Sequence, residues 1–279
     1  AVPDPQVHIS PNSLKTWLPG SEFVYGRGAT GASWTEPRCT VTSVTAGATP
    51  GTVDIVMAQP CWDHAFTKGG NQGPHKGPSD IENSVELLRT SLLTKSTAGE
   101  WFGDFASNKI YYKPMPGETP AGVKAVLGTV PSSGDGAATV VLRPGVERVH
   151  FTNLVFTHNT WLQPSGPDGF VDLQSGFFFD TPDGKDSILR GVPGVLALHG
   201  TKNINVTNCT FEHLGLTGLL ADEGAQEISV THSKFRDLSG SAIALGNVSK
   251  PILTKEEEDG KSTNSNLKPL LKLRISCLH

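Results

Sequence analysis

Several signatures of common protein classes are missing from this sequence. The chain has 279 residues and a formal net charge of −4, and its lysines and arginines form no cluster, so the electrostatic footprint of a nucleic-acid-binding protein is absent. No run of about 18 apolar residues occurs, which argues against a helical membrane span. The P-loop, the G-x-S-x-G turn and the H-E-x-x-H motif are absent as well. We therefore expect no nucleic-acid partner, no membrane partner and no cofactor.

Cysteine is scarce, with four residues in the chain. Cys39 and Cys61 lie at the ends of strand-like segments, so a disulfide across that hairpin is one expectation and free thiols are the other. Cys209 falls inside an internal repeat, where we expect a small buried thiol. The 31 glycines and 20 prolines suit a turn-rich all-β protein.

An internal repeat is the most informative feature that is present. The stretch Ile204–Phe211 returns as Ile228–Phe235, a displacement of 24 residues (228 minus 204), and an earlier copy occupies Val149–Phe156. Apolar residues alternate within each copy, as at Ile204 and Val206, which is the periodicity of a β-strand. A fixed period in this range indicates stacked units, because each unit can bury its apolar face only against its neighbours.

This pattern predicts an all-β chain whose repeats form about three coils of a right-handed parallel β-helix over residues 146–248. An irregular, β-rich accessory region would precede the coils over residues 1–145, and a polar, atypical tail would follow over residues 249–279. The alternative is a leucine-rich repeat, because its period of about 20–29 residues includes this one. The leucine-rich signature fits part of one copy and does not recur in the other two.

The region before the repeats carries signals for individual elements. A hairpin is predicted from Glu100–Phe102 and Lys109–Pro114, which flank a turn of small and polar residues. Ser79–Arg89 is predicted as a helix, because it combines a capping residue with apolar positions on one face. Residues 63–80 are polar and glycine-rich, and we predict that they form a long loop.

The repeats are interrupted once, and their pattern breaks near the C-terminus. An excursion of about 35 residues, from Thr160 to Gly194, separates the first copy from the second, and such insertions form loops on one face. After Leu245 the next coil should begin near residue 252, but a charged run follows instead. We expect the last coil to be uncovered unless Leu270–Ile275 folds back as a cap, and we expect the chain to be a shortened form of a longer protein.

One column of the repeat would bring titratable side chains together, because equivalent positions in successive coils lie about 4.8 Å apart. Two residues after the repeated phenylalanine, this column contains His158, His213 and Asp237. A carboxylate beside an imidazole fixes its tautomer and suits proton transfer or sugar binding. We predict Asp237 as a catalytic carboxylate, His213 as the proton carrier and His158 as a substrate-binding residue. The alternative is a hydrogen-bonded corner ladder that binds no substrate.

Other polar positions give further candidates. Asp222 and Glu223 are reserve catalytic acids, on a loop at a different corner of the coil. A second column is interpreted as structural, because stacked side-chain amides at a corner hydrogen-bond one another; it contains Asn153, Asn208 and His232.

The excursion adds four candidates for substrate binding, which are Trp161, Asp168, Asp172 and Gln174. Trp161 would either stack on a pyranose ring or cover the core. His64 and His75 are separated by a glycine-rich stretch and make a poor metal pair, so we predict no metal site.

Six motifs carry a resemblance to a known family. They are Met57–Trp62, Ile81–Leu88, Gly99–Asp104, Ile110–Glu118, Thr160–Ser165 and Phe211–Gly215. Together they cover roughly residues 22–248, and the chain resembles secreted right-handed β-helix proteins of glycoside hydrolase family 141. Residues 91–98 look like an insertion relative to that family. The family also continues through further coils, which are expected to hold the catalytic carboxylates.

The resemblance implies a secreted glycoside hydrolase that acts on a plant or algal polysaccharide containing fucose or xylose. By this resemblance the chain is expected to be a glycosidase, although we also expect it to lack the coils that hold the catalytic carboxylates, so whether it is itself an enzyme stays open. Two alternatives come from other classes: a non-catalytic carbohydrate-binding or adhesive module, and a polysaccharide lyase. All of them have a polysaccharide or oligosaccharide as the partner.

Overall fold

The computed structural model describes residues 19–25, 35–68, 78–83, 98–104, 107–119, 121–128, 137–173, 176–181, 184–185, 187–247 and 273–276. The chain divides into two compact units. The N-terminal unit comprises residues 1–125, 163–174 and 181–186, and the repeat unit comprises residues 126–162, 175–180 and 187–279. The described residues are nearly all strands and connections, with a single α-helix among them. Within these residues no helix is long and apolar enough to cross a membrane.

Antiparallel strands form the core of the N-terminal unit. Its strands are β1 (Glu22–Val24), β2 (Arg38–Ala46), β3 (Val53–Met57), β4 (Asp80–Glu82), β5 (Trp101–Asp104), β6 (Lys109–Tyr112) and β10 (Asp172–Leu173). The first four make one sheet in the order β3-β2-β1-β4, which buries side chains such as Phe23 and Val41. The predicted hairpin is confirmed, because β5 and β6 pair antiparallel with Trp101 opposite Tyr112.

The predicted helix over Ser79–Arg89 is wrong at its start. Asp80–Glu82 is strand β4, whose backbone pairs with Glu22–Val24, and such tertiary pairing overrides a weak local helix preference. The guanidinium of Arg38 strengthens this arrangement by bonding to Glu22 at 2.7 Å and to Glu82. Burial alone would lower the pKa of Arg38, but the two carboxylates outweigh burial and raise it. Asn83 has a left-handed backbone (φ 52°), and residues 84–89 of the predicted helix lie outside the described residues.

Helix α2 (Cys61–Lys68) occupies a stretch that was predicted as the start of a long loop, so that prediction is wrong there. The carbonyl of the Gln59 side chain accepts a hydrogen bond from the backbone N–H of Asp63 at 3.3 Å, which satisfies an amide of the first turn. Cys61 forms a disulfide with Cys39 on β2, and both cysteines are buried. The predicted pairing of these two cysteines is confirmed.

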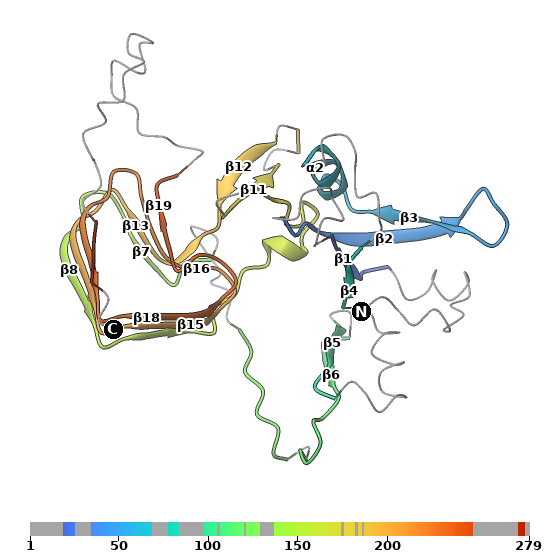
Figure 1. Ribbon diagram of the computed structural model, residues 1–279, viewed down its shortest axis with the longest axis horizontal. Coiled ribbons are helices and arrows are strands. Elements are labelled where there is room, and N and C mark those ends of the chain that lie inside the picture. Colours follow the sequence, from blue (N-terminus) through green and yellow to red (C-terminus); the bar gives the residue numbers. More distant parts are fainter. Residues whose placement is uncertain are drawn as a thin grey trace, which may run out of the picture. The chain divides into compact units, whose positions relative to one another are not determined.

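Parallel strands of successive coils form the repeat unit. They are β7 (Val140–Leu142), β8 (Glu147–Thr152), β9 (Val155–Thr157), β13 (Gly194–His199), β14 (Lys202–Thr207), β15 (Thr210–Leu214), β16 (Thr217–Asp222), β17 (Gln226–Thr231), β18 (Lys234–Leu238), β19 (Ile243–Leu245) and β20 (Leu273–Ser276). Their sheets have the orders β19-β16-β13-β7, β20-β17-β14-β8 and β18-β15-β9. The chain therefore passes through one strand of each sheet before it returns to the first (Figure 1).

The register between coils follows the period of the sequence. Ile204 pairs with Val149 on one side and with Ile228 on the other, as predicted. No helix separates the strands in residues 194–247, so the helices expected of an ordinary leucine-rich repeat do not occur there. Cys209 is a buried free thiol within this stack, which confirms its predicted setting.

The C-terminal strand β20 is an edge strand of the second parallel sheet. Leu273 lies opposite Ile228 in a parallel pairing of β20 with β17, 45 residues further along the chain (273 minus 228) rather than 24. The sequence predicted an uncovered last coil unless Leu270–Ile275 folded back, and residues 273–275 do fold back as an additional strand of the second sheet. The charged run before them lies outside the described residues.

The excursion between the first two copies contains a small hairpin. Strands β11 (Phe177–Asp180) and β12 (Ile188–Gly191) pair antiparallel, and the guanidinium of Arg190 forms an ion pair with Asp180. A short 3₁₀ helix, η1 (Gln163–Ser165), belongs to the N-terminal unit.

An aromatic column fills the interior of the coils. The ring of Phe211 lies between those of Phe156 and Phe235, with centroid distances of 4.7 and 4.6 Å and nearly parallel planes. Phe211 has no exposed surface, and Ile204 on β14 has none either. Because each coil buries these side chains only against the coils beside it, the column couples the stability of all three.

We expect Phe211→Ala to lower the free energy of unfolding by about 3–5 kcal/mol, because the substitution leaves a cavity between two stacked rings. Leu154→Ala is the matched control, since Leu154 is 44% exposed in the same unit and its loss should cost less than about 0.5 kcal/mol. Urea unfolding of both variants measures the difference. Equal urea midpoints for the two variants would contradict the proposed role of the column.

Candidate functional site

Three residues at or near the C-terminal ends of β9, β15 and β18 share an uncommon backbone conformation, and we call this place in the coil a corner. His158 follows β9, His213 lies in β15 and Asp237 lies in β18, with φ values of 56°, 53° and 53°. Asn, Asp and His are enriched among the non-glycine residues that adopt this left-handed conformation. The corner backbone therefore accounts for the residue types in the column, and a binding role needs evidence from the side chains.

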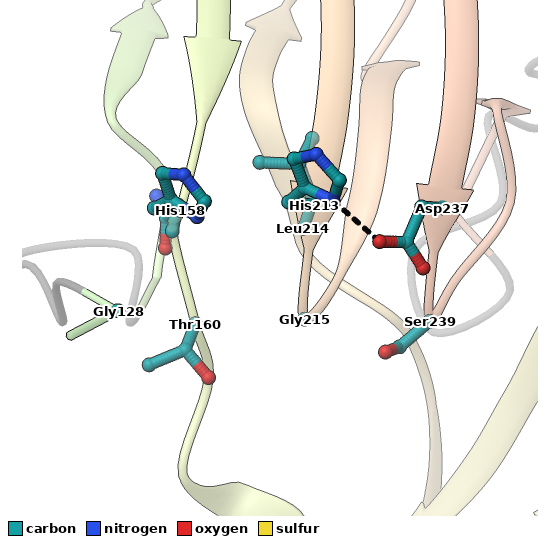
Figure 2. Close-up of a pocket in the computed structure, with 9 residues that line it drawn as sticks. Gly128, His158, Thr160, His213, Leu214, Gly215, Asp237 and Ser239 are labelled. Carbon is teal, nitrogen blue, oxygen red and sulfur yellow. Dashed lines mark hydrogen bonds and ion pairs between the residues drawn. The ribbon is translucent and has the colours of Figure 1, made fainter. Parts of the chain in front are cut away.

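The side chains of this column do come together (Figure 2). The imidazole rings of His158 and His213 are stacked, with centroids 5.3 Å apart and planes within 7°. His213 Nδ1 lies 2.5 Å from Asp237 Oδ2. When the imidazole is neutral, this contact requires the proton on Nδ1, because the carboxylate can only accept. The Nε2 atom of His213 is then a hydrogen-bond acceptor.

An open cavity of about 320 Å³ lies over these residues. It is lined by Gly128, His158, Asn159, Thr160, His213, Leu214, Gly215, Asp237 and Ser239. The side chains of His213 and Asp237 are 46% and 73% exposed, so both reach solvent despite their contact with each other. The cavity thus offers two imidazoles, a carboxylate and two hydroxyl groups to a ligand.

Sequence reasoning missed several of the residues that line the cavity. One of them, Asn159, holds this part of the cavity wall against a neighbouring segment of the chain. Its side chain is buried, and its Nδ2 donates to the backbone carbonyl of Ala137 at 2.9 Å and to Thr139 Oγ1 at 2.6 Å. These bonds tie the corner to the segment that enters β7. Thr160 and Ser239 are the other missed polar groups. Each lies two residues after a member of the predicted column, which is the signal that would have identified them.

Gly215 allows the wall of the cavity to close tightly. A β-carbon at this position would lie 2.9 Å from Thr160 Oγ1 and 3.2 Å from Thr160 Cα. The backbone of Gly215 is held in place by a hydrogen bond from its N–H to the carbonyl of Asn159 at 2.9 Å. A larger residue here would push Thr160 away from the cavity.

The second column behaves as the structural interpretation predicts. Asn208 Nδ2 donates to Asn153 Oδ1 at 2.6 Å, so a hydrogen bond joins the two amides across the coils. These residues and His232 also have left-handed backbones, with φ between 53° and 58°. The left-handed corner and the amide bond account for the asparagines of this column without a ligand.

Asp222 and Glu223 lie elsewhere in the repeat unit and do not line the cavity. The side chain of Asp222 is 1% exposed and contacts His199 Nδ1, and its other oxygen accepts a hydrogen bond from Asn247 Nδ2 at 3.2 Å. Sequence reasoning did not identify His199. His199 is the last residue of β13 and pairs with Asp222 in the next coil. The two residues are 23 positions apart, the same spacing that pairs Leu196 with Leu219.

The described candidates on the excursion, Trp161, Asp168 and Asp172, do not line the cavity. Trp161 packs against Phe178, with ring centroids 5.1 Å apart, which favours the core-covering interpretation over an exposed sugar platform. Asp168 accepts a hydrogen bond from the backbone N–H of Thr181 at 3.0 Å, and Asp172 belongs to the N-terminal unit like Asp168. Gln174 lies outside the described residues.

One other carboxylate lies next to the column in sequence. Glu212 and Arg236 are paired in register on β15 and β18, and Glu212 Oε2 accepts from Arg236 Nε at 2.6 Å. Neither residue lines the cavity. Among the described residues that do line it, Asp237 is the sole carboxylate.

Comparison with known proteins identifies a fold and no family. No family model and no curated protein matches the sequence. The structure matches a solved structure named "Glycoside hydrolase" with a TM-score of 0.55 and 21% sequence identity. The match covers 81% of this chain and 38% of the other chain, so this chain spans less than half of that protein's length. At this identity the likeness shows a shared fold, and family 141 stays a prediction.

We expect Asp237→Asn to change the tautomer of His213. Above about pH 9, where histidine is ordinarily neutral, the native carboxylate should hold the proton on Nδ1, and the amide should let the Nε2–H form increase. Nitrogen-15 chemical shifts of the imidazole measure the two forms. Glu212→Gln is the matched control, because it removes the neighbouring carboxylate and leaves His213 with Asp237. An unchanged tautomer ratio in Asp237→Asn would show that the contact does not orient the ring.

Proposed function

We propose that this chain is the carbohydrate-binding part of a secreted, glycoside-hydrolase-like protein with a right-handed parallel β-helix fold of the family 141 type. The one-strand-per-sheet path of the coils supports the β-helix. The name of the structural neighbour supports the relationship to glycoside hydrolases. The Cys39–Cys61 disulfide supports an oxidising compartment, and hence secretion.

The cavity over His158, His213 and Asp237 carries this proposal. Its volume of about 320 Å³ is within the usual range of small-ligand sites, roughly 300–1,000 Å³. A sugar ring presents neighbouring hydroxyl groups that each donate and accept hydrogen bonds. The exposed carboxylate of Asp237 would accept from two of them, and such charge-assisted bonds are stronger than neutral ones. The hydroxyl groups of Thr160 and Ser239 would complete the polar contacts.

Binding without turnover is the activity that this geometry favours. Most glycoside hydrolases need two carboxyl groups, about 5–5.5 Å apart for retention or about 6.5–9.5 Å apart for inversion. Asp237 alone supplies a carboxylate among the described residues that line the cavity. Hydrolysis is the second candidate, with Asp237 and His213 as its proton-transfer pair, and the neighbour's name is the observation in its favour. The family resemblance suggests fucose or xylose as the sugar.

We expect the chain to bind a fucose- or xylose-containing plant or algal polysaccharide, and Asp237→Asn to weaken that binding at least tenfold, a loss of about 1.4 kcal/mol. Titration calorimetry with a panel of such glycans measures the affinity. Glu227→Gln is the matched control, because Glu227 has the same left-handed backbone (φ 55°), is exposed in the same stack and does not line the cavity.

Product analysis on the same panel separates the candidate functions. New reducing ends would establish hydrolysis, and unsaturated products that absorb in the ultraviolet would establish a lyase. If no glycan of the panel binds, or if Asp237→Asn and Glu227→Gln bind equally well, the cavity is not a carbohydrate site and the column is a structural ladder.

A further inference from the structure

A second cluster of ligating side chains lies where two strands of the first parallel sheet end. His199 is the last residue of β13 and Asp222 is the last residue of β16, and the two are paired in register. Glu223 follows Asp222 directly. One ligating atom from each of these three residues lies within 4.8 Å of the other two. None of the three lines the cavity over His158, so what this cluster does is independent of the proposed function.

Burial distinguishes this cluster from a chance gathering of surface acids. The side chain of Asp222 is 1% exposed, and that of His199 is 16% exposed. A carboxylate that is removed from water needs a cation, a metal ion or several hydrogen bonds to offset its lost hydration. Asp222 has His199 on one oxygen and the Asn247 amide, at 3.2 Å, on the other. The half-buried carboxylate of Glu223 adds a second negative charge at the same place.

The backbone holds the cluster rigidly. The carbonyl of Asp222 accepts hydrogen bonds from the N–H groups of Gly200 and Ala225, both at 3.0 Å. Gly200 has a φ of 56°, and a β-carbon there would lie 3.1 Å from the carbonyl oxygen of Glu223. The two turns that carry the ligating residues are therefore packed against each other and joined by hydrogen bonds. A site of this kind needs little rearrangement to receive an ion.

We propose that His199, Asp222 and Glu223 bind a divalent transition-metal ion. The donor set is one imidazole and two carboxylates. Imidazole is a usual ligand of Zn²⁺ and related ions and carboxylate a usual ligand of Mn²⁺, whereas Ca²⁺ takes six to eight oxygen ligands. Three protein ligands leave coordination positions for water or for a further ligand, as in catalytic rather than purely structural sites.

Mn²⁺ is the suitable probe, because it prefers oxygen and nitrogen donors and so avoids the cysteine thiols of the chain. We expect the intact protein to bind one Mn²⁺ at this cluster, measured by the loss of the free-ion signal in electron paramagnetic resonance, and Zn²⁺ to displace it. Glu223→Gln should weaken the binding at least tenfold, the scale of loss expected when a metal site is damaged, about 10–100-fold. A tenfold excess of Ca²⁺ should not compete.

Glu227→Gln is the matched control, since Glu227 is an exposed carboxylate of the same stack and should leave Mn²⁺ affinity unchanged. Glu223→Gln is preferred to a change at buried Asp222, and its urea midpoint without metal checks that it folds. The proposal is overturned if the intact protein binds no Mn²⁺, in which case hydrogen bonds and neighbouring charges alone stabilise the cluster. Equal affinity of Glu223→Gln and the parent chain would also overturn it, by placing the ion elsewhere.

Discussion

In-register pairing between coils is the interaction on which the repeat unit depends. Each parallel ladder of the repeat unit joins residues 23 or more positions apart, and the same register stacks Phe156, Phe211 and Phe235 in the interior. A slip of one residue would turn every buried side chain outward, because successive side chains of a strand point to opposite faces. The apolar interior therefore fixes the register, and the register in turn fixes which polar side chains meet at the corners.

The repeated path of the chain also places residues with a left-handed backbone conformation at equivalent positions of successive coils. The chain must turn between sheets at the same place in every coil, so the same position repeatedly adopts a positive φ. Such positions favour Asn, Asp and His, which are also residues that bind ligands and move protons, and here Arg148 and Glu227 adopt the same conformation. A column of polar residues at a corner is thus expected on backbone grounds alone. The environment of the side chains decides whether it does more.

The sequence predicted the parts of the molecule that obey its period. The pairing of Ile204 with Ile228 and the meeting of His213 with Asp237 follow from counting 24 residues. The pairing of Ile204 with Val149 follows from aligning the earlier copy of the repeated motif. The helix predicted at Ser79 was wrong because the pairing of β4 with β1 joins residues about 60 positions apart, which no local pattern records. His199 was missed for a related reason. Its register partner Asp222 lies 23 residues further along the chain, one fewer than the period, so counting by 24 does not pair them.

The two corner columns show why similar backbones carry different chemistry. In one, Asn208 and Asn153 bond to each other, and each amide uses a donor or an acceptor on a partner of its own kind. In the other, an acceptor-only carboxylate meets a donor of His213, and the exposed carboxylate of Asp237 keeps lone pairs toward solvent. A cavity also opens at this corner, with Asn159 tied into β7 behind it. Both columns leave polar groups exposed, so exposure alone does not distinguish them. The difference is that the polar groups of the His213–Asp237 corner line an open cavity, which is what the proposed binding site needs.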